Sequence, residues 1–422
     1  MPQGAAADST QHTDSMGCMN IFVARQPIFD RRREVMGYEL LFRSGLENAF
    51  GSTQGDQASL SMLNTTLLGF GLDSLVGDKT AFINASREVM IKEHWAVFPP
   101  ERTVIELLES VEPDDEVISA CIAARRAGYR VALDDFAWRP EYEALLPHVD
   151  CIKVDFLATT GEQRTELVRR CARPGLRMLA EKVETYEEFH AGLAAGYDLF
   201  QGYFFCKPEM VTGRDVQPLQ ANLVRLLTEV SRAEIDFDRL EALIKREVTL
   251  SVKLLRYLHS AGFGWRHEVN TIGQALRILG ERPTRKWASL VALTLIGEDK
   301  PRELMTTSLV RAQFCEELGA IASLPDRQVD HFLAGLLSTL DAILNQPMEQ
   351  LLSQMSISEE IAHALLDGDS LLGDTLRLAI AYDRADWWRV ASLSAKSAIA
   401  ERHLPEAYRR AVNWVNGVLA EP

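Results

Sequence analysis

Short apolar runs that end in polar or charged residues recur through the first half of the chain. Eight runs lie between residue 19 and about residue 206, and from the fourth onward they recur every twenty to thirty residues. A short continuous apolar run is typical of a strand that is buried on both faces, as in a parallel sheet covered by helices. The runs span 21–24, 37–42, 80–84, 103–109, 130–135, 151–155, 177–181 and 198–205.

Helix-like segments separate the later runs, among them 116–127 and 162–171. Regular alternation of strand and helix predicts parallel βαβ units. Eight such units fit an α/β fold, a (β/α)8 TIM-like barrel, in number and length. A doubly wound open sheet is the alternative, and it is disfavoured because no glycine-rich phosphate-binding turn follows the first run.

The pattern changes in the second half of the chain. Apolar residues there recur at a spacing of three to four with short polar breaks, which predicts an all-α domain of about 200 residues. We expect a disordered polar tail over 1–18, a barrel domain over 19–208, a linker over 209–216 and the helical domain over 217–422. The helical segments span 219–230, 238–244, 250–260, 272–279, 285–295, 307–322, 330–343, 359–366, 371–381 and 389–400.

The ends of the apolar runs are unusually acidic. The carboxyl ends of barrel strands meet at one mouth, and carboxylates crowded there repel one another unless cations neutralise them. Oxygen ligands select Mg²⁺, Mn²⁺ or Ca²⁺ over Zn²⁺, so a divalent metal site is expected. The alternative is a ring of solvated carboxylates that cap the following helices. The polar residues at the run ends are Glu39, Asn84, Glu106, Glu109, Asp134, Asp135, Lys153, Asp155, Glu181, Glu184 and Gln201.

The composition limits the classes of partner that the chain can bind. The net charge of -15 and the pI near 5.2 argue against binding to nucleic acid or to an anionic membrane, because both require a basic surface. No window of about eighteen apolar residues predicts a membrane span, and the polar N-terminus lacks the features of a signal peptide. The six cysteines show no metal-binding spacing, so we expect reduced thiols in a cytoplasmic protein.

Seven segments resemble, in order, the motif set of EAL domains. These are barrel phosphodiesterases that hydrolyse cyclic di-GMP to the linear dinucleotide pGpG. The segments are Tyr-Glu-Leu-Leu-Phe-Arg at 38–43, Phe-Ile-Asn at 82–84, Val-Ile-Glu-Leu-Leu-Glu at 104–109, Leu-Asp-Asp-Phe at 133–136, Ile-Lys-Val-Asp at 152–155, Ala-Glu-Lys-Val-Glu at 180–184 and Gln-Gly-Tyr at 201–203.

The resemblance implies a role for each site residue. The ligands of one Mg²⁺ or Mn²⁺ would be Glu39, Asn84, Glu106 and Asp134, and Asp135 would bring in a second ion. Lys153 and Glu181 would position or activate the attacking water. Gln201 and Glu184 would support substrate and metal, and Gln26 would contact the substrate. Glu109 normally holds the loop after the Asp-Asp pair in this family.

Two other charged residues have more than one interpretation. Arg43 suits a bidentate phosphate contact, with a surface ion pair as the alternative. Lys153 and Asp155 could instead form an ordinary salt bridge at the barrel mouth.

Two departures from the EAL pattern bear on the second metal ion. The usual glycines after Asp134-Asp135-Phe136 are replaced by the bulkier segment Ala-Trp-Arg-Pro at 137–140, which stiffens a loop that shapes the second site in active relatives. Lys182 replaces a glycine between the two glutamates at 181 and 184. Its ammonium would pair with Glu181 or point to solvent.

Segments 250–261 and 271–280 resemble HDOD domains, helical relatives of metal-dependent HD phosphohydrolases that have lost the metal ligands. Ser338 and Thr339 stand here where an active relative carries His-Asp. We therefore expect this half to bind a protein partner rather than to catalyse.

Two functions remain open on the sequence alone. The first is a cytoplasmic cyclic di-GMP phosphodiesterase with a helical output domain. The second is a receptor or scaffold whose barrel binds cyclic di-GMP without hydrolysing it. Analogy with active relatives adds a homodimer formed through the barrel as a further expectation.

Overall fold

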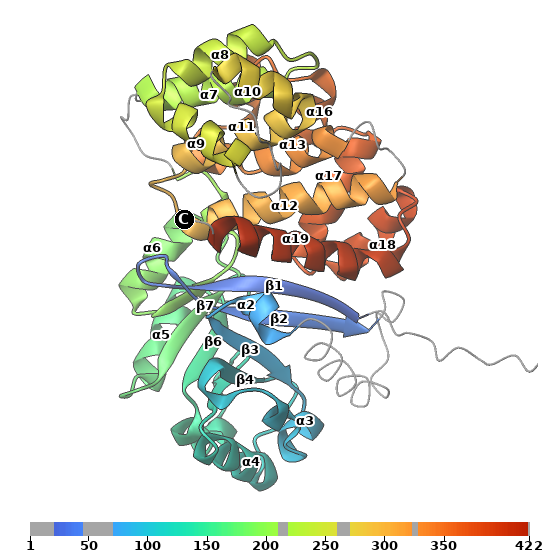
Figure 1. Ribbon diagram of the computed structural model, residues 1–422. Coiled ribbons are helices and arrows are strands. Elements are labelled where there is room, and N and C mark those ends of the chain that lie inside the picture. The colour runs from blue at the N-terminus through green and yellow to red at the C-terminus, as the bar shows by residue number, and fades with distance from the viewer. Residues whose placement is uncertain (1–20, 45–70, 210–217, 260–270, 323–327, 421–422) are drawn as a thin grey trace, which may run out of the picture.

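The computed structural model describes residues 21–44, 71–209, 218–259, 271–322 and 328–420 (Figure 1). The predicted tail and nearly all of the predicted linker lie outside these ranges. Eight strands form a closed barrel in the order β1 to β8, and a helical half packs on one side of it, as Figure 1 shows. The strands are β1 (Ile21–Asp30), β2 (Val35–Ser44), β3 (Thr80–Ala85), β4 (Thr103–Leu107), β5 (Arg130–Leu133), β6 (Cys151–Asp155), β7 (Arg177–Glu181) and β8 (Leu199–Gln201).

The prediction of parallel strands is correct for β2 to β8 and wrong for β1. Strand β1 is antiparallel to both of its neighbours, β2 and β8. The reason is the short connection of residues 31–34, because a parallel pair needs a crossover of a dozen residues or more. The Asp30 carboxylate accepts hydrogen bonds from the backbone N–H groups of Arg32 (2.8 Å) and Glu34 (2.9 Å), which fixes the hairpin turn.

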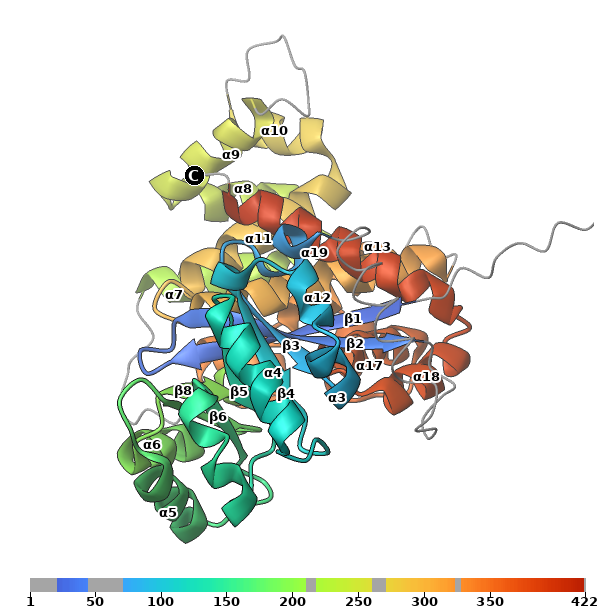
Figure 2. The same ribbon diagram turned by 90° about the horizontal axis from the view of Figure 1, so that it is seen from below.

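Helices cover the outside of the barrel between the later strands (Figure 2). Thr160 and Thr185 start α5 and α6 with reciprocal capping boxes, in which each threonine hydroxyl accepts from the backbone three residues on. The helices of this half are α2 (Leu72–Val76), α3 (Arg87–Ile91), α4 (Asp115–Arg126), α5 (Gly161–Cys171) and α6 (Tyr186–Ala195), with 3-10 turns η1 (His94–Val97), η2 (Pro100–Arg102), η3 (Pro140–Glu143), η4 (Leu146–His148) and η5 (Phe204–Cys206).

The second half is helical, as the periodicity predicts. Its elements are α7 (Pro218–Val230), α8 (Phe237–Lys245), α9 (Val248–His259), α10 (Ile272–Leu279), α11 (Glu281–Ile296), α12 (Arg302–Ile321), α13 (Gln328–Leu337), α14 (Leu340–Leu344), α15 (Met348–Gln354), α16 (Glu359–Leu365), α17 (Leu371–Asp383), α18 (Trp387–Lys396), η7 (Glu401–His403) and α19 (Leu404–Ala420).

The helical half differs from the prediction at three places. The single helix expected over 330–343 is two helices, because the chain breaks at Ser338 and Thr339. The Ser338 hydroxyl donates to the Gly335 carbonyl (2.7 Å), a local bond that competes with the helical ladder. Helices α15 and α19 were not predicted, although α19 packs against both α12 and β1.

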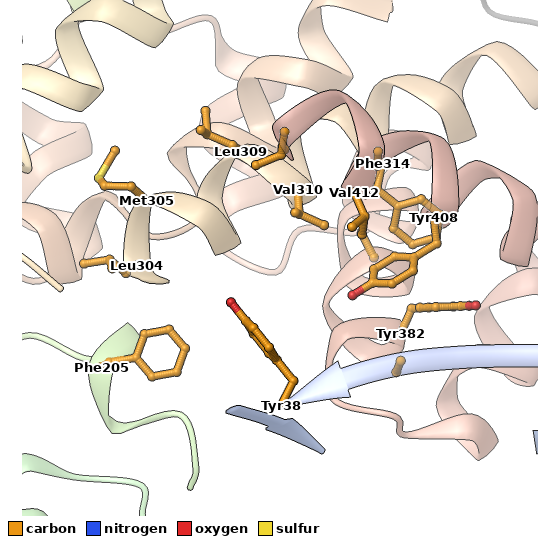
Figure 3. Packing of buried hydrophobic residues seen from close by; sticks show 14 of the residues in the cluster. Tyr38, Phe205, Leu304, Met305, Leu309, Val310, Phe314, Tyr382, Tyr408 and Val412 are labelled. Atoms are coloured by element: carbon orange, nitrogen blue, oxygen red, sulfur yellow. The ribbon is translucent and has the colours of Figure 1, made fainter. Parts of the chain in front are cut away.

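The two halves share one continuous hydrophobic core. Figure 3 shows Tyr38 of β2 and Phe205 of η5 facing the apolar side chains of α12, with aromatic residues of α17 and α19 beside them. The Tyr382 ring of α17 lies 4.8 Å from the Tyr408 ring of α19 and 6.4 Å from the Phe22 ring of β1, centroid to centroid. Burial of this kind stabilises by about 25 cal/mol per Å² of apolar surface, so the halves are held by a core rather than by a surface contact.

Polar contacts fix the orientation of this packing. The Tyr38 hydroxyl donates to Glu303 Oε2 at 2.8 Å, and the Arg25 guanidinium lies 4.7 Å above the Tyr38 ring. Burial raises the pKa of Glu303, and Arg25 opposes the shift. The Arg311 Nε atom donates to Asp383 Oδ2 at 2.7 Å, and both side chains are buried.

No helix in the described ranges has the length and apolar character needed to cross a membrane. Cys121, Cys151, Cys171, Cys206 and Cys315 are free thiols, as expected.

The Tyr38→Phe variant tests the orientation of the two halves. We expect it to lower the free energy of unfolding by about 1–3 kcal/mol, because the buried Glu303 carboxyl loses its hydrogen-bond donor. Urea unfolding measures the change. The matched control is Tyr142→Phe, because the Tyr142 hydroxyl accepts from a half-exposed arginine (2.9 Å) and its loss should cost less than about 0.5 kcal/mol. Equal losses in the two variants would contradict the assignment.

Candidate active site

The barrel interior has an apolar lower layer and a polar upper layer. Successive side chains of a strand point to opposite faces, so residues two apart point the same way. Each parallel strand from β3 to β8 therefore places an apolar residue in the lower layer and, two residues later, a polar residue at the mouth. The lower layer consists of Ile28, Phe82, Val104, Ala132, Cys151, Leu179 and Leu199. The upper layer consists of Asn84, Glu106, Asp134, Lys153, Glu181 and Gln201, joined by Glu39 of β2 and Gln26 of β1.

A fully buried lysine lies at the centre of the upper layer. Lys153 Nζ is 2.7 Å from Asp134 Oδ1, 2.9 Å from Glu181 Oε1, 3.0 Å from Glu106 Oε1 and 3.3 Å from Glu39 Oε2. The predicted metal ligands and the predicted catalytic pair therefore meet around one ammonium group. The alternative salt bridge between Lys153 and Asp155 does not form.

One ammonium group leaves an excess of negative charge among four carboxylates. Burial raises the pKa of Glu106 well above its usual range, and the neighbouring Glu39 adds to the shift. Burial also raises the pKa of Glu181 to about 8, although Lys153 opposes it. The pKa of Asp134 is raised for the same reasons. The site therefore holds protons at neutral pH, or it holds a further cation.

Glu39 is the exception among these carboxyl groups. Burial alone would raise the pKa of Glu39, but Lys153 holds it below the usual range together with two hydrogen bonds. Gln201 Nε2 donates to Glu39 Oε2 at 2.6 Å, and Asn84 Nδ2 donates to Glu39 Oε1 at 3.2 Å. Glu39 is thus the carboxylate that stays ionised most readily.

Several oxygens of the upper layer are buried without a hydrogen-bond donor. Among the described residues these include Asn84 Oδ1, Glu106 Oε2, Glu181 Oε2 and Gln201 Oε1. Buried oxygens without donors cost free energy unless a cation or a proton satisfies them. An all-oxygen set of this kind fits Mg²⁺ or Mn²⁺.

The carboxylates surround the lysine rather than a vacant point. Within the part of the chain that the structure describes, no three His, Cys, Asp or Glu side chains converge as ready-made metal ligands. A divalent ion would therefore have to share the upper layer with the Lys153 ammonium.

Lys182 makes a contact that the sequence did not predict. It pairs neither with Glu181 nor with solvent alone: its Nζ lies 2.5 Å from Asp155 Oδ2 and 3.6 Å from Asp135 Oδ1. Its backbone has φ +55°, a conformation that favours glycine, which explains why the EAL pattern carries glycine there. The residue expected to bring in a second metal ion, Asp135, thus already has a cation beside it.

The altered loop at 137–140 contacts residues that do not line the cavity at the barrel mouth. Arg139 NH1 donates to Glu112 Oε1 at 3.2 Å, and Arg170 lies 4.1 Å above the Trp138 ring. Glu109 is exposed and does not line the cavity at the mouth, whereas Glu112 pairs with this loop through Arg139.

Arg43 does not itself line the cavity. It lies on the same face of β2 as Glu39 but two residues beyond Leu41, the last residue of that strand to line the cavity. Gln26 and Glu184, by contrast, both line the cavity, as expected of residues that meet substrate.

The cavity at the mouth is built by both halves of the chain. It has a volume of about 380 Å³, and one of its walls is formed by Arg384 and Ala385 of the α17–α18 loop and by Trp387, the first residue of α18. Sequence analysis missed these residues, and it gave no role to Tyr203, which also lines the cavity. No motif marks Arg384, Ala385 or Trp387, because they lie far along the chain from the barrel residues they face; Arg384 is 358 positions from Gln26.

Family models match both halves. An HDOD domain model matches residues 216–398, and an EAL domain model matches residues 82–208. The cyclic di-GMP phosphodiesterase CdgJ of Vibrio cholerae serotype O1 is 36% identical over 369 residues, which cover 87% of this chain and 85% of CdgJ. The protein YuxH of Bacillus subtilis is 31% identical over 409 residues, which cover 95% of this chain and 99% of YuxH.

Similar solved structures match part of this chain. The calcium and cyclic di-GMP complex of BlrP1 from Klebsiella pneumoniae is 26% identical, with a TM-score of 0.37 over 44% of this chain and 55% of that one. The Bacillus subtilis YkuI protein, in complex with cyclic di-GMP and calcium, is 20% identical, with a TM-score of 0.36 over 57% of this chain and 64% of that one. This chain thus spans just over half of BlrP1. With CdgJ and YuxH aligned over most of their length, the chain belongs to the family of bacterial proteins that join an EAL domain to an HDOD domain.

Proposed function

We propose that the chain is a metal-dependent phosphodiesterase that hydrolyses cyclic di-GMP to pGpG. The observation that carries the proposal is the upper layer of the barrel, where buried oxygens without donors surround Lys153 at the base of a nucleotide-sized cavity. The similarity to CdgJ, which is named as a cyclic di-GMP phosphodiesterase, supports this substrate.

In this proposal, Glu39, Asn84, Glu106 and Asp134 hold one Mg²⁺ or Mn²⁺. When bound, such an ion polarises the phosphate and lowers the pKa of water. The low pKa of Glu39 and the donor-free Asn84 Oδ1 support these assignments.

The remaining residues transfer protons or contact the substrate. Glu181 takes the proton of the attacking water, a role that suits a carboxyl group whose pKa is raised toward neutrality. Lys153 orients Glu181 through its 2.9 Å contact and offsets negative charge that develops on the phosphate. Gln201, Gln26 and Glu184 contact substrate or support the metal ligands.

The second candidate function is a receptor that binds cyclic di-GMP without turnover. The observation that favours it is the Lys182 ammonium between Asp155 and Asp135, which competes with a second divalent ion. We favour hydrolysis with one ion, because the ligands proposed for the first ion are all present.

The proposal also covers the cellular location of the protein and its partners. A cyclic di-GMP enzyme of this composition acts in the cytoplasm, and we place its domain boundary in the segment 209–216. The helical half would recruit a protein partner through exposed apolar side chains such as Trp388, whose side chain is 75% exposed. Homodimers through the barrel remain an inference by analogy.

The Glu39→Ala variant tests hydrolysis. With Mn²⁺, we expect the wild type to convert cyclic di-GMP to pGpG, and the variant to lose more than about 100-fold in rate, since even outer-shell partners of a metal are worth 10–100-fold. Chromatography of the nucleotides measures the product. Glu101→Ala is the matched control, because Glu101 is an exposed carboxylate before β4, at the other end of the barrel. Tight binding without product in the wild type would favour the receptor instead.

The Glu106→Gln variant tests the metal site without an activity assay. Glutamine keeps the size of Glu106 and removes a carboxyl group whose charged form burial disfavours, so the apo Tm should stay within about 2 °C of wild type. Saturating Mn²⁺ should stabilise the wild type by about 2.7 kcal/mol at 100 times Kd and the variant far less. Glu303→Gln, another buried glutamate with a raised pKa, should keep the full response to Mn²⁺. Loss of the response in both variants would point to a general effect on stability.

The Lys182→Gly variant tests the second ion. Glycine removes the ammonium beside Asp135 and relieves the left-handed backbone, so we expect bound Mn²⁺ to rise from one to two ions per chain and turnover to rise with it. Lys182→Ala removes the charge but keeps the strained backbone, which separates the two effects. Calorimetric titration counts the ions, and an unchanged count would show that Lys182 does not limit the second site.

A further inference from the structure

The loop between α17 and α18 closes one side of the barrel mouth. Arg384, Ala385 and Trp387 line the same cavity as Glu39, Asp134 and Glu181, although they belong to the helical half. In Figure 1 this half lies along β1 and β2, the two strands that carry Gln26 and Glu39.

Four anchors hold this loop in place. The Asp383 carboxylate pairs with Arg311, and the Asp383 carbonyl accepts a hydrogen bond from the Tyr203 hydroxyl at 2.5 Å. The Arg384 carbonyl accepts from Gln26 Nε2 at 3.2 Å. The Trp387 ring packs 5.9 Å from the ring of Phe22 on β1, centroid to centroid. Three of the four anchors come from the barrel, so the position of the loop is set by the site it covers.

The same hydrogen bonds connect the loop to a proposed metal ligand. Gln201 Nε2 lies within hydrogen-bonding distance of both Gln26 Oε1 (3.2 Å) and Glu39 Oε2 (2.6 Å). Gln26 in turn donates to Arg384. The side chains of Gln26 and Gln201 therefore connect the Arg384 backbone to Glu39.

The Arg384 side chain differs from the other cations of the site. Lys153 and Lys182 are each paired with carboxylates. The exposed Arg384 guanidinium lies 5.1 Å above the Tyr203 ring, and in the described ranges no carboxylate pairs with it. Stacking on an aromatic face orients the planar guanidinium and leaves its edge donors available for an anion.

The negative charge of the cavity makes a cationic group necessary for binding an anionic nucleotide. Its barrel wall presents Glu39, Asp134, Asp135, Glu181 and Glu184, whereas a cyclic dinucleotide carries two phosphodiester charges. A cation at the carboxylates can neutralise one phosphate, but the other faces a field that repels it. An arginine on the opposite wall supplies bidentate donors suited to phosphate.

Resting on the function proposed above, we propose that Arg384 of the helical half binds a phosphate of the cyclic dinucleotide, so that the substrate site is complete only when both halves are present. Helical and barrel residues then share one substrate. A change in the packing of the helical half would therefore change the affinity for nucleotide.

Calorimetry on the full chain tests the proposal, with cyclic di-GMP as the probe and Ca²⁺ in place of Mn²⁺. We expect Arg384→Ala to weaken nucleotide binding about tenfold, or about 1.4 kcal/mol, and Arg384→Lys to recover only part of the loss. Arg389→Ala is the matched control, because Arg389 is an exposed arginine near this loop that does not line the cavity, and its affinity should stay within about twofold of wild type. In the Mn²⁺ assay the Arg384→Ala variant should raise KM with little change in kcat, and its thermal response to Mn²⁺ alone should be that of wild type.

Equal affinities for wild type, Arg384→Ala and Arg389→Ala would overturn the proposal. Tighter binding by Arg384→Ala would also overturn it, because the loop would then obstruct the mouth rather than bind substrate. Absence of any nucleotide binding by the wild type would instead refute the proposed function, and this inference with it.

Discussion

The contact between Lys153 and four carboxylates is the constraint on which the site depends. Two unit charges 4 Å apart interact by about 4 kcal/mol at an effective dielectric constant of 20, so four buried carboxylates around one ammonium cannot all stay ionised. The raised pKa values of Glu106, Asp134 and Glu181 express this excess of negative charge. Such a centre is unstable without protons or cations, and selection for packing alone would replace it with apolar residues. Its presence in a closed barrel therefore points to a function rather than to packing alone.

The alternation of side chains along the barrel strands positions this cluster at the mouth. A parallel strand repeats its side-chain direction every two residues, which separates an apolar plug from a polar mouth within one barrel. The antiparallel first strand departs from this pattern, and the departure is useful: it places Gln26 opposite Glu39 across the hairpin, while Arg25 and Tyr38, one residue away, face the helical half. One pair of strands thus serves the site on one face and the contact between the halves on the other.

The convergence of the site could be predicted from sequence, because any residue at the carboxyl end of a barrel strand must reach the same mouth. Glu39, Glu106, Asp134, Lys153 and Glu181 follow from that rule and from the EAL motifs. The direction of β1 could have been predicted too, since residues 31–34 are too few for a crossover. The partner of Lys182 could not, because a flexible side chain chooses among several carboxylates. The role of Arg384 could not either, because only the packing of α17 and α19 on β1 brings it to the mouth.

A chain of polar contacts crosses the helical half and ends at the barrel mouth. Ser338 and Thr339, between α13 and α14, form hydrogen bonds with Arg311 and Ser308. The Arg311 guanidinium then pairs with Asp383, the residue that begins the loop at the barrel mouth. The planar Arg311 guanidinium orients its neighbours through directed donors. Ser338 is therefore connected through Arg311 and Asp383 to the loop that carries Arg384. Any partner that displaces α12 or α17 would act on the nucleotide site through the buried ion pair between Arg311 of α12 and Asp383 of α17. Breaking such a pair costs about 3–5 kcal/mol, and the two helices cannot separate without breaking it.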